Sequence, residues 1–264
     1  MKLLVLGSGS CELSRQRSSP AYLVIAGRNR IMLDAGQGSL RRMIDAGYDP
    51  ARLNALAISH HHPDHLADVA PLLFALNYDD RLRRLARLVI LGHPKLEDIF
   101  EGLNFTFGEW LNPPAPRLSK LWLTPGRSVA IGGLRLDSFP ANHMESSLAY
   151  RLTYGGHSLV YLGDSQASAE LARFAYGADL LLAHCAGSEE APKKNHMHPS
   201  MAGKLAAAAR VKSLLLSHFY RDVDPKAAVS VASAFYQGPV WAAYDHMEVV
   251  ISRDPGETPP ALKE

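Results

Sequence analysis

The sequence predicts an α/β protein in which two β-sheets are flanked by helices. Short apolar runs without helical periodicity, which are typical of buried strands, alternate along the chain with amphipathic or alanine-rich segments, which are typical of helices. Histidine and aspartate residues also follow several predicted strands, for example 53–59, 158–162 and 213–217. This recurrence indicates a functional site built at the ends of strands.

In the first half of the chain, each predicted strand is a short apolar run that turn residues end. The first strand stops at the glycine-rich turn 7–10, and the turn 27–29 joins the next two strands into a hairpin. Gly47 ends the first predicted helix. The predicted strands are 2–6, 21–25, 30–33, 53–59 and 88–91, and the predicted helices are 37–46, 67–76 and 95–103.

In the second half, a hairpin forms around Gly155-Gly156, and an alanine-rich helix precedes the strand 213–217. The strands are 134–139, 148–152, 158–162, 180–183, 213–217, 240–241 and 247–251, and the helices are 199–210 and 227–236. The stretch 104–123 carries aromatic residues and a proline-rich turn. It could cover the substrate, form a satellite core or contact a second subunit in a homodimer.

Length and composition limit the classes of protein to which the sequence can belong. With 264 residues, of which 47% are hydrophobic, the chain can bury one large core. We predict a single domain over 1–254, with two fused half-domains as the alternative, and a disordered tail over 255–264. The net charge of +2 gives no strongly basic nucleic-acid surface. The sequence has only two cysteines and shows neither a secretory signal nor a membrane span. We therefore predict a soluble cytoplasmic protein with reduced thiols.

The segment 59–65, with the sequence Ser-His-His-His-Pro-Asp-His, has the spacing of a metal site. His60 and His62 can place two imidazoles on one metal ion, and the adjacent Asp64 and His65 can turn toward a second ion from an irregular loop. Three imidazoles and one carboxylate suit a borderline divalent ion such as zinc better than calcium or magnesium. A polar loop that is merely rich in histidine is the alternative. The strand–loop–helix context favours a metal site.

These residues, with others further along the chain, carry a family resemblance. The chain resembles the metallo-β-lactamase-fold hydrolases, and among them the ribonuclease Z-like phosphodiesterases. The segment 60–65 matches the second family motif, and the opening 6–10 followed by 17–19 is similar to the ribonuclease Z branch. The remaining matches are the first motif at 34–36, the third at 142–143, the fourth at 162–165, the fifth at 216–219, and His196 ahead of 202–206.

The resemblance implies a four-layer αββα sandwich of two mixed sheets and a centre with two metal ions. Position by position, it implies that one ion is bound by His60, His62 and His143, that the other is bound by Asp64, His65 and His218, and that Asp164 bridges them. The ions would be zinc, with manganese or iron as alternatives, and a metal-bridging hydroxide would attack the substrate. Asp64 counts as catalytic as well as a ligand. The resemblance also implies that Asp34 orients the metal loop through hydrogen bonds.

The histidines outside the ligand set are considered for other roles. The alignment of 202–206 implies that His196 is the second catalytic residue, which contacts the scissile phosphate and protonates the leaving oxygen. His198 stands beside the start of a predicted helix and is expected to lie near its cap. The role of His184 stays open, because many relatives carry a carboxylate near this position.

The implied function is a dinuclear phosphodiesterase that acts on RNA ends or on small or cyclic phosphodiesters. The alternatives are a hydrolase of a lactone, thioester or sulfate ester on the same metals, or an iron-dependent redox protein. In tRNA-processing relatives, an arm that clamps tRNA is inserted between the third and fourth motifs. Here a single hairpin separates His143 from Asp164, which favours a small or exposed phosphodiester over precursor tRNA.

Overall fold

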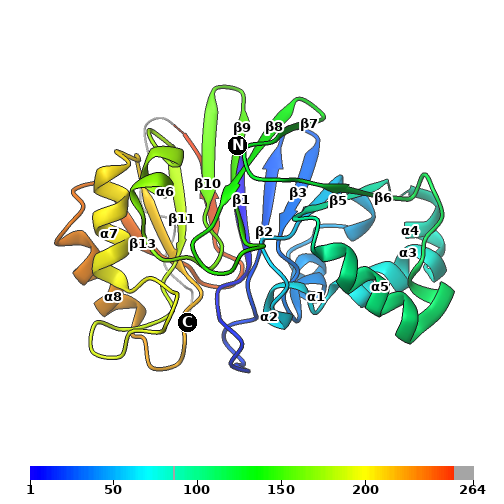
Figure 1. Ribbon diagram of the computed structural model, residues 1–264, viewed down its shortest axis with the longest axis horizontal. Helices are drawn as coiled ribbons and strands as arrows, with labels where there is room; N and C mark the ends of the chain where they lie inside the picture. The colour runs from blue at the N-terminus through cyan, green and yellow to red at the C-terminus, as the bar shows by residue number, and fades with distance from the viewer. Residues whose placement is uncertain (86, 253–264) are drawn as a thin grey trace.

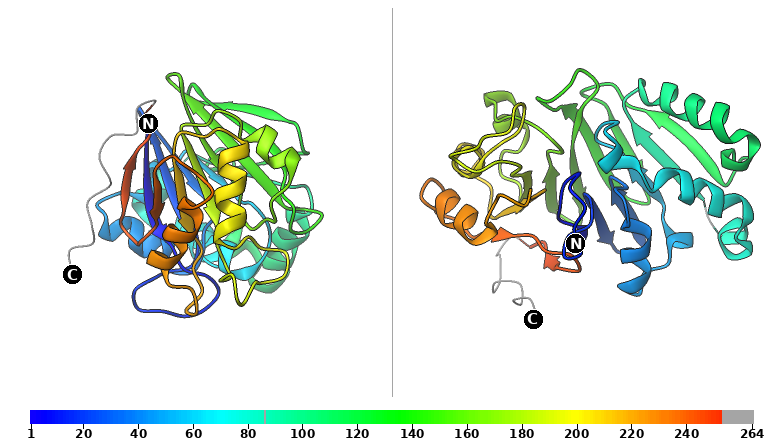
Figure 2. Two further views of the ribbon diagram at one scale, coloured as in Figure 1. Left: turned by 90° about the vertical axis from the view of Figure 1, so that its left-hand side faces the viewer. Right: turned by 90° about the horizontal axis from the view of Figure 1, so that it is seen from below.

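Two seven-stranded sheets lie face to face, and helices cover the outer face of each (Figure 1). The computed structural model describes residues 1–85 and 87–252. Figure 2 shows the layers from two further directions. The observed architecture confirms the predicted α/β class and the αββα order of layers. The tail predicted over 255–264 lies outside the described residues.

The first sheet contains strands from the N-terminal half and one strand from the far end of the chain. In spatial order it comprises β14 (Glu248–Val250), β1 (Lys2–Gly7), β2 (Ala21–Ala26), β3 (Asn29–Leu33), β4 (Ala55–Ala57), β5 (Leu88–Gly92) and β6 (Leu118–Trp122). The first three pairings are antiparallel and the last three are parallel. This sheet is therefore mixed.

The second sheet repeats this pattern with the strands of the second half. Its spatial order is β7 (Ser128–Ile131), β8 (Leu134–Pro140), β9 (Leu148–Tyr154), β10 (His157–Tyr161), β11 (Leu180–His184), β12 (Leu214–Ser217) and β13 (Val240–Ala242). Again three antiparallel pairings are followed by three parallel ones. The two halves of the chain thus build similar sheets that share one interior.

Three apolar clusters hold the layers together. The central cluster fills the space between the sheets, and residues such as Leu33, Leu136 and Leu159 are fully buried there. A second cluster joins the second sheet to α6 (Ala169–Phe174), α7 (Pro199–Ala208) and α8 (Pro225–Ser233). A third cluster joins the first sheet to its helices, which are α1 (Ser39–Asp45), α2 (Pro63–Leu66), α3 (Val69–Tyr78), α4 (Asp80–Leu85) and α5 (Leu96–Phe107). Burial of these apolar faces is the main source of stability.

Most predicted elements form, and the differences have local causes. The edge strands β6 and β7 and the six-residue helices α4 and α6 were not predicted. Both edge strands expose much of their surface, and the short helices have too few turns to show periodicity. The strand predicted over 53–59 is limited to Ala55–Ala57, because Pro50–Arg52 forms a 3₁₀ turn (η1) directly before it.

The metal-loop segment is more regular than the sequence analysis assumed. Asp64 and His65 lie in the short helix α2, not in an irregular loop. Pro63 occupies the first turn of this helix, where its fixed φ angle favours helix and its missing N–H costs nothing. From adjacent positions of this turn, Asp64 and His65 bring Oδ2 and Nε2 to within 3.7 Å of each other.

The aromatic stretch between α5 and β6 divides into exposed and buried parts. Phe105, Phe107 and Trp110 are exposed, and Leu111 is buried. Phe107 and Trp110 line a shallow apolar cavity of about 370 Å³ together with Phe74 of α3. A satellite core is therefore wrong for the exposed side chains, whereas covering of the substrate and contact with a second subunit both stay predictions.

The packing of α7 against α8 gives a test of the fold. A Cβ added at Gly203 would lie 2.4 Å from the backbone oxygen of Ala232, so Gly203→Ala should destabilise the protein by about 1–3 kcal/mol. Gly102 in α5 has no neighbouring atom within 4 Å of such a Cβ, and Gly102→Ala should stabilise by roughly 0.5–1 kcal/mol. Urea unfolding would measure both changes. Equal destabilisation by the two substitutions would contradict the packing explanation.

Candidate metal centre

The seven predicted ligand residues meet where loops from both sheets converge. Residues 60–65 follow β4 of the first sheet, whereas His143, Asp164 and His218 follow β8, β10 and β12 of the second. Four strands that are distant in the sequence thus end close together, and the ligand side chains that follow them meet there. The imidazoles of His60, His65 and His218 and the carboxylate of Asp164 are almost fully buried.

One group of donor atoms consists of three imidazole nitrogens and a carboxylate oxygen. His60 Nε2 and His143 Nε2 lie 3.0 Å and 3.3 Å from His62 Nδ1. Asp164 Oδ2 is 3.6 Å from His60 Nε2 and 3.8 Å from His143 Nε2. All four ligand atoms lie within 4.8 Å of one another. Three neutral imidazoles and one carboxylate are a suitable set for a tetrahedral divalent metal ion.

A second group shares Asp164. His218 Nε2 lies 3.4 Å from both Asp64 Oδ2 and Asp164 Oδ1, and His65 Nε2 lies 3.7 Å and 3.5 Å from Asp64 Oδ2 and Asp164 Oδ2. Among the described residues, both Nε2 atoms are buried without a hydrogen-bond partner. An unpaired buried polar atom is costly. A metal ion between these groups would satisfy both nitrogens, so the residues present fit a metal.

His184 competes with Asp64 for a place in this second group. By proximity alone, His184 joins His65, Asp164 and His218. However, its Nδ1 is 2.7 Å from Asp164 Oδ1, and its Nε2 is 3.1 Å from the hydroxyl of Tyr22. With both ring nitrogens engaged, His184 has no free lone pair for a metal. We therefore assign Asp64, and not His184, to the second group.

The buried carboxylate of Asp34 fixes the orientation of the second group. It accepts hydrogen bonds from Ser59 N (2.6 Å), Ser59 Oγ (2.7 Å), His65 Nδ1 (2.7 Å) and the hydroxyl of Tyr161. The bond from His65 Nδ1 leaves Nε2 of that ring to face the cluster. In the first group, His143 Nδ1 donates to the backbone oxygen of Asn195 (3.1 Å). Such outer contacts set the tautomer and the direction of a ligating imidazole.

Two glycines allow the segments of the centre to approach closely. A Cβ on Gly36 would lie 2.3 Å from the backbone oxygen of Asp64. Gly163, directly before Asp164, has a φ of +59°, and a Cβ there would lie 2.9 Å from the Cβ of Ser59. A side chain at either position would force the segments apart.

The electrostatics favour ionised carboxylates. Burial raises the pKa of Asp64, but the nearby imidazole of His218 and the charge of His65 outweigh it and lower that pKa to about 2. Burial likewise opposes ionisation of Asp164, but His218 and His65 bring its pKa well below the usual range. For His60, burial lowers the pKa well below its ordinary value, which leaves the ring neutral. Asp64, Asp164 and His60 are therefore in the forms that bind metal. Burial lowers the pKa of His65, but the charges of Asp164 and Asp34 outweigh it and raise that pKa well above its ordinary value, so metal binding there would release a proton.

His196 lies at the edge of the cluster. Its Nδ1 is 3.7 Å from Asp164 Oδ2 and has no hydrogen-bond partner among the described residues, and its ring centroid is 4.9 Å from that of His143. Burial lowers its pKa to about 4. By contrast, His198 is the N-cap residue of α7, with Nδ1 3.0 Å from Glu189 Oε1. Its predicted position at the cap is confirmed.

Several polar residues around the centre were not predicted from the sequence. Tyr22, Tyr161 and Ser217 lie within strands and contact His184, Asp34 or each other. Their only sequence signal is a hydroxyl inside an otherwise apolar run. Such a hydroxyl needs a buried partner, but the sequence does not identify that partner.

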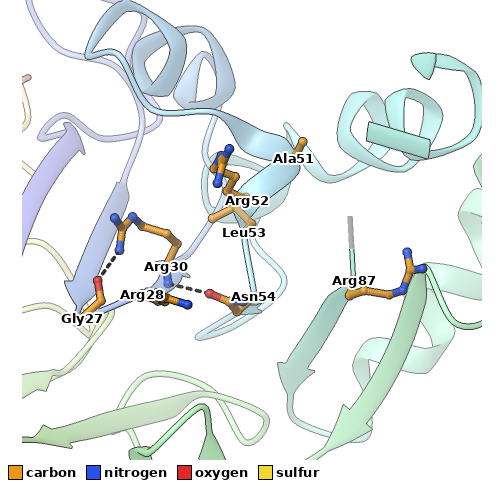
Figure 3. A pocket seen from close by; sticks show the side chains of 8 residues that line it. All are labelled: Gly27, Arg28, Arg30, Ala51, Arg52, Leu53, Asn54 and Arg87. Atoms are coloured by element: carbon orange, nitrogen blue, oxygen red, sulfur yellow. Dashed lines mark hydrogen bonds between the residues drawn. The ribbon is translucent and has the colours of Figure 1, made fainter. Parts of the chain in front are cut away.

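Two further cavities differ in their relation to the centre. One, of about 290 Å³, adjoins His218 and is lined by residues that include Arg17, Tyr220 and Arg221. The other, of about 590 Å³, is lined by Arg28, Arg30, Arg52 and Arg87 (Figure 3). It lies where β3, β4 and β5 begin, away from the ligand-bearing ends of the strands. Of these two cavities, the first is the one next to the candidate site.

Comparison with known proteins places these observations in a family. A model of the Beta-lactamase superfamily domain matches residues 29–219. The probable metallo-hydrolase YhfI of Bacillus subtilis (strain 168) is 28% identical over 222 residues, which cover 83% of this chain and 86% of the relative. Ribonuclease Z of Bradyrhizobium sp. (strain ORS 278) is 26% identical over 305 residues, which cover 94% and 99%.

Solved structures agree with this comparison. The metallo-β-lactamase fold protein YhfI from Bacillus subtilis matches with a TM-score of 0.82 and 26% identity over 94% of this chain and 97% of that chain. The short form of human tRNase Z matches with a TM-score of 0.74 and 21% identity over 96% and 100%. The resemblance to the metallo-β-lactamase fold is confirmed. Among the described residues, no helix is long and apolar enough to cross a membrane.

Proposed function

The chain belongs to the β-lactamase superfamily, and we propose that, within it, this metal-dependent hydrolase is a phosphodiesterase with two divalent metal ions. The observation that carries the proposal is the pair of donor groups that share Asp164, with two buried imidazole nitrogens left unpaired between them. Relatives named metallo-hydrolase and ribonuclease Z support it.

We assign His60, His62 and His143 to one ion, Asp64, His65 and His218 to the other, and Asp164 to both. Zinc suits this set of imidazoles and carboxylates, and a zinc-bound PqqB from Methylobacterium extorquens has a similar fold. When bound, two such ions acidify water and offset the negative charge of a phosphodiester transition state. The hydrogen bonds of His65 with Asp34 and of His143 with the backbone oxygen of Asn195 hold these two imidazoles in place.

The position of His196 supports its role as a general acid. Its unpartnered Nδ1 faces the cluster from the edge, where a leaving oxygen would depart. The low pKa of His196 arises first from burial. A bound anionic phosphodiester would add negative charge beside the ring and raise that pKa, so that the imidazole could hold a proton and transfer it from the ring nitrogen.

The substrate is expected to be a small or exposed phosphodiester. The segment between His143 and Asp164 contains only the hairpin of β9 and β10, which leaves no inserted arm to hold a folded RNA. The cavity of about 290 Å³ beside His218 is of the size of one small group, and Arg17 and Arg221 supply positive charge at its wall. A short RNA end or a cyclic diester fits these dimensions better than a tRNA surface.

A substrate screen tests the proposed function. Metal-loaded protein should hydrolyse bis-p-nitrophenyl phosphate or a cyclic nucleotide, and leave precursor tRNA, lactones and sulfate esters largely intact. Treatment with a chelator should abolish the activity, and added zinc or manganese should restore it. Cleavage of a lactone or sulfate ester in preference to every diester would contradict the proposal. Cleavage of precursor tRNA at the rate of the small diester would contradict only the size argument.

Metal analysis of two variants tests the ligand assignment. The wild-type protein should hold up to two divalent ions per chain. Asp164→Ala should lose metal at both sites because it removes the shared ligand, and His143→Ala should mainly empty one site. Elemental analysis after dialysis would measure the stoichiometry. Two ions per chain in the Asp164 variant would show that this residue is not a bridge.

A comparison of leaving groups tests His196. His196→Ala should reduce turnover by roughly 10²–10⁴ on a diester with a poor alkoxide leaving group, and much less with p-nitrophenolate, which departs without a proton. Metal content should not change. His198→Ala is the matched control, because that side chain pairs with Glu189 at the cap of α7, and it should have little effect on either substrate. An equal loss on both leaving groups would exclude the general-acid role.

A further inference from the structure

A series of hydrogen-bonded, buried polar groups lies next to the shared carboxylate of Asp164. Ser217 Oγ and the hydroxyl of Tyr22 are 2.7 Å apart, Tyr22 is 3.1 Å from His184 Nε2, and His184 Nδ1 is 2.7 Å from Asp164 Oδ1. All four residues are at most 2% exposed. Tyr22 belongs to β2 of the first sheet, and His184 and Ser217 end β11 and β12 of the second. This series of hydrogen bonds therefore crosses the interior from one sheet to the other.

The chemistry of the partners fixes the direction of the hydrogen bonds. An ionised carboxylate only accepts, so His184 Nδ1 carries the hydrogen and donates to Asp164. In the neutral ring, Nε2 is then an acceptor, and the Tyr22 hydroxyl donates to it. The Tyr22 and Ser217 hydroxyls share a further hydrogen bond. Each donor in this order has one acceptor, so the four groups satisfy one another.

We propose that His184 is a positioning residue that holds Asp164 in its bridging orientation, with Tyr22 fixing the His184 tautomer that can do so. The inference rests on the two-metal site of the proposed function. Asp164 must present Oδ2 toward His60, His65 and His143 and Oδ1 toward His218. Rotation of the carboxylate about its last bond would disturb both groups at once, and the His184 hydrogen bond to Oδ1 opposes that rotation.

The rings around His184 leave it little freedom. Its centroid lies 4.6 Å from that of His218 in a stacked arrangement, 5.3 Å from Tyr161 and 5.7 Å from His65. The imidazole is therefore held by packing as well as by hydrogen bonds. Because this ring is fixed, its hydrogen bond holds the carboxylate of Asp164, which follows β10, in a defined position relative to the strands.

The first test compares two buried tyrosines. Tyr22→Phe removes the hydroxyl that meets His184. Tyr150→Phe is the matched control, because Tyr150 is equally buried and its hydroxyl also crosses between the sheets, but donates to the backbone oxygen of Ile58 (2.6 Å). The affinity for zinc alone, measured by competition with a chromogenic chelator, should fall about 10- to 100-fold in Tyr22→Phe. It should stay near the wild-type value in Tyr150→Phe, although both lose thermal stability. Equal affinities in the two variants would overturn the inference.

The second test separates a positioning residue from a ligand. An asparagine amide can reproduce a donor near the position of Nδ1, so His184→Asn should retain more zinc affinity than His184→Leu. Equal loss of one zinc ion in both variants would make His184 a ligand and overturn the inference. Because zinc binding is measured without substrate, failure to hydrolyse any diester would count against the proposed function alone. A wild-type protein that binds no zinc would overturn both.

Discussion

A carboxyl group in a protein interior must be surrounded by hydrogen-bond partners, and Asp34 is the residue at which this requirement shapes the structure. Its side chain is completely buried, and its four donors come from Ser59, His65 and Tyr161. These contacts connect the end of β3 to the segment after β4, to the helix α2 and to the opposite sheet. The loop that carries the ligands is thus anchored before any metal binds.

Buried hydroxyl groups also need hydrogen-bond partners, as do those of the three largest fully buried side chains among the described residues, which are Tyr22, Tyr150 and Tyr161. Each places a ring in or beside the apolar interior and sends its hydroxyl across to the other sheet. Two of them reach residues that orient donor atoms, and the third reaches the backbone at Ile58, directly before the ligand loop. A packed interior has few alternative arrangements, so the contacts of Tyr22 and Tyr161 favour one geometry for the centre. Buried contacts between the two sheets therefore both stabilise the sandwich and order the site.

The position of the centre at the edge of the interior also serves the proposed chemistry. The donor atoms of the second group are screened from water on the protein side, whereas His196 and the cavity beside Tyr220 face the surface. A low-dielectric surrounding strengthens the interactions between fixed charges and a reacting phosphodiester. His196, the residue proposed to supply the proton, therefore lies on a more exposed side of the centre than His65 and His218.

The sequence by itself determined the class of fold, and with the family resemblance it supplied the candidate ligands. Apolar runs located the central strands, because buried strands must be apolar on both faces, and the compact spacing of residues 60–65 after a predicted strand indicated a metal loop. Edge strands such as β6 escaped detection because half of their surface is solvated and their composition resembles that of a loop. The helical turn at Asp64 and His65 was missed because one turn is too short to show a period. Only the tertiary structure decided which polar groups meet: the pairing of Asp34 with His65, and of His184 with Asp164 and Tyr22, joins residues 20 to 162 positions apart. Hydrogen bonds act over about 3 Å, so their partners are set by the register and packing of the two sheets, which local sequence patterns do not encode.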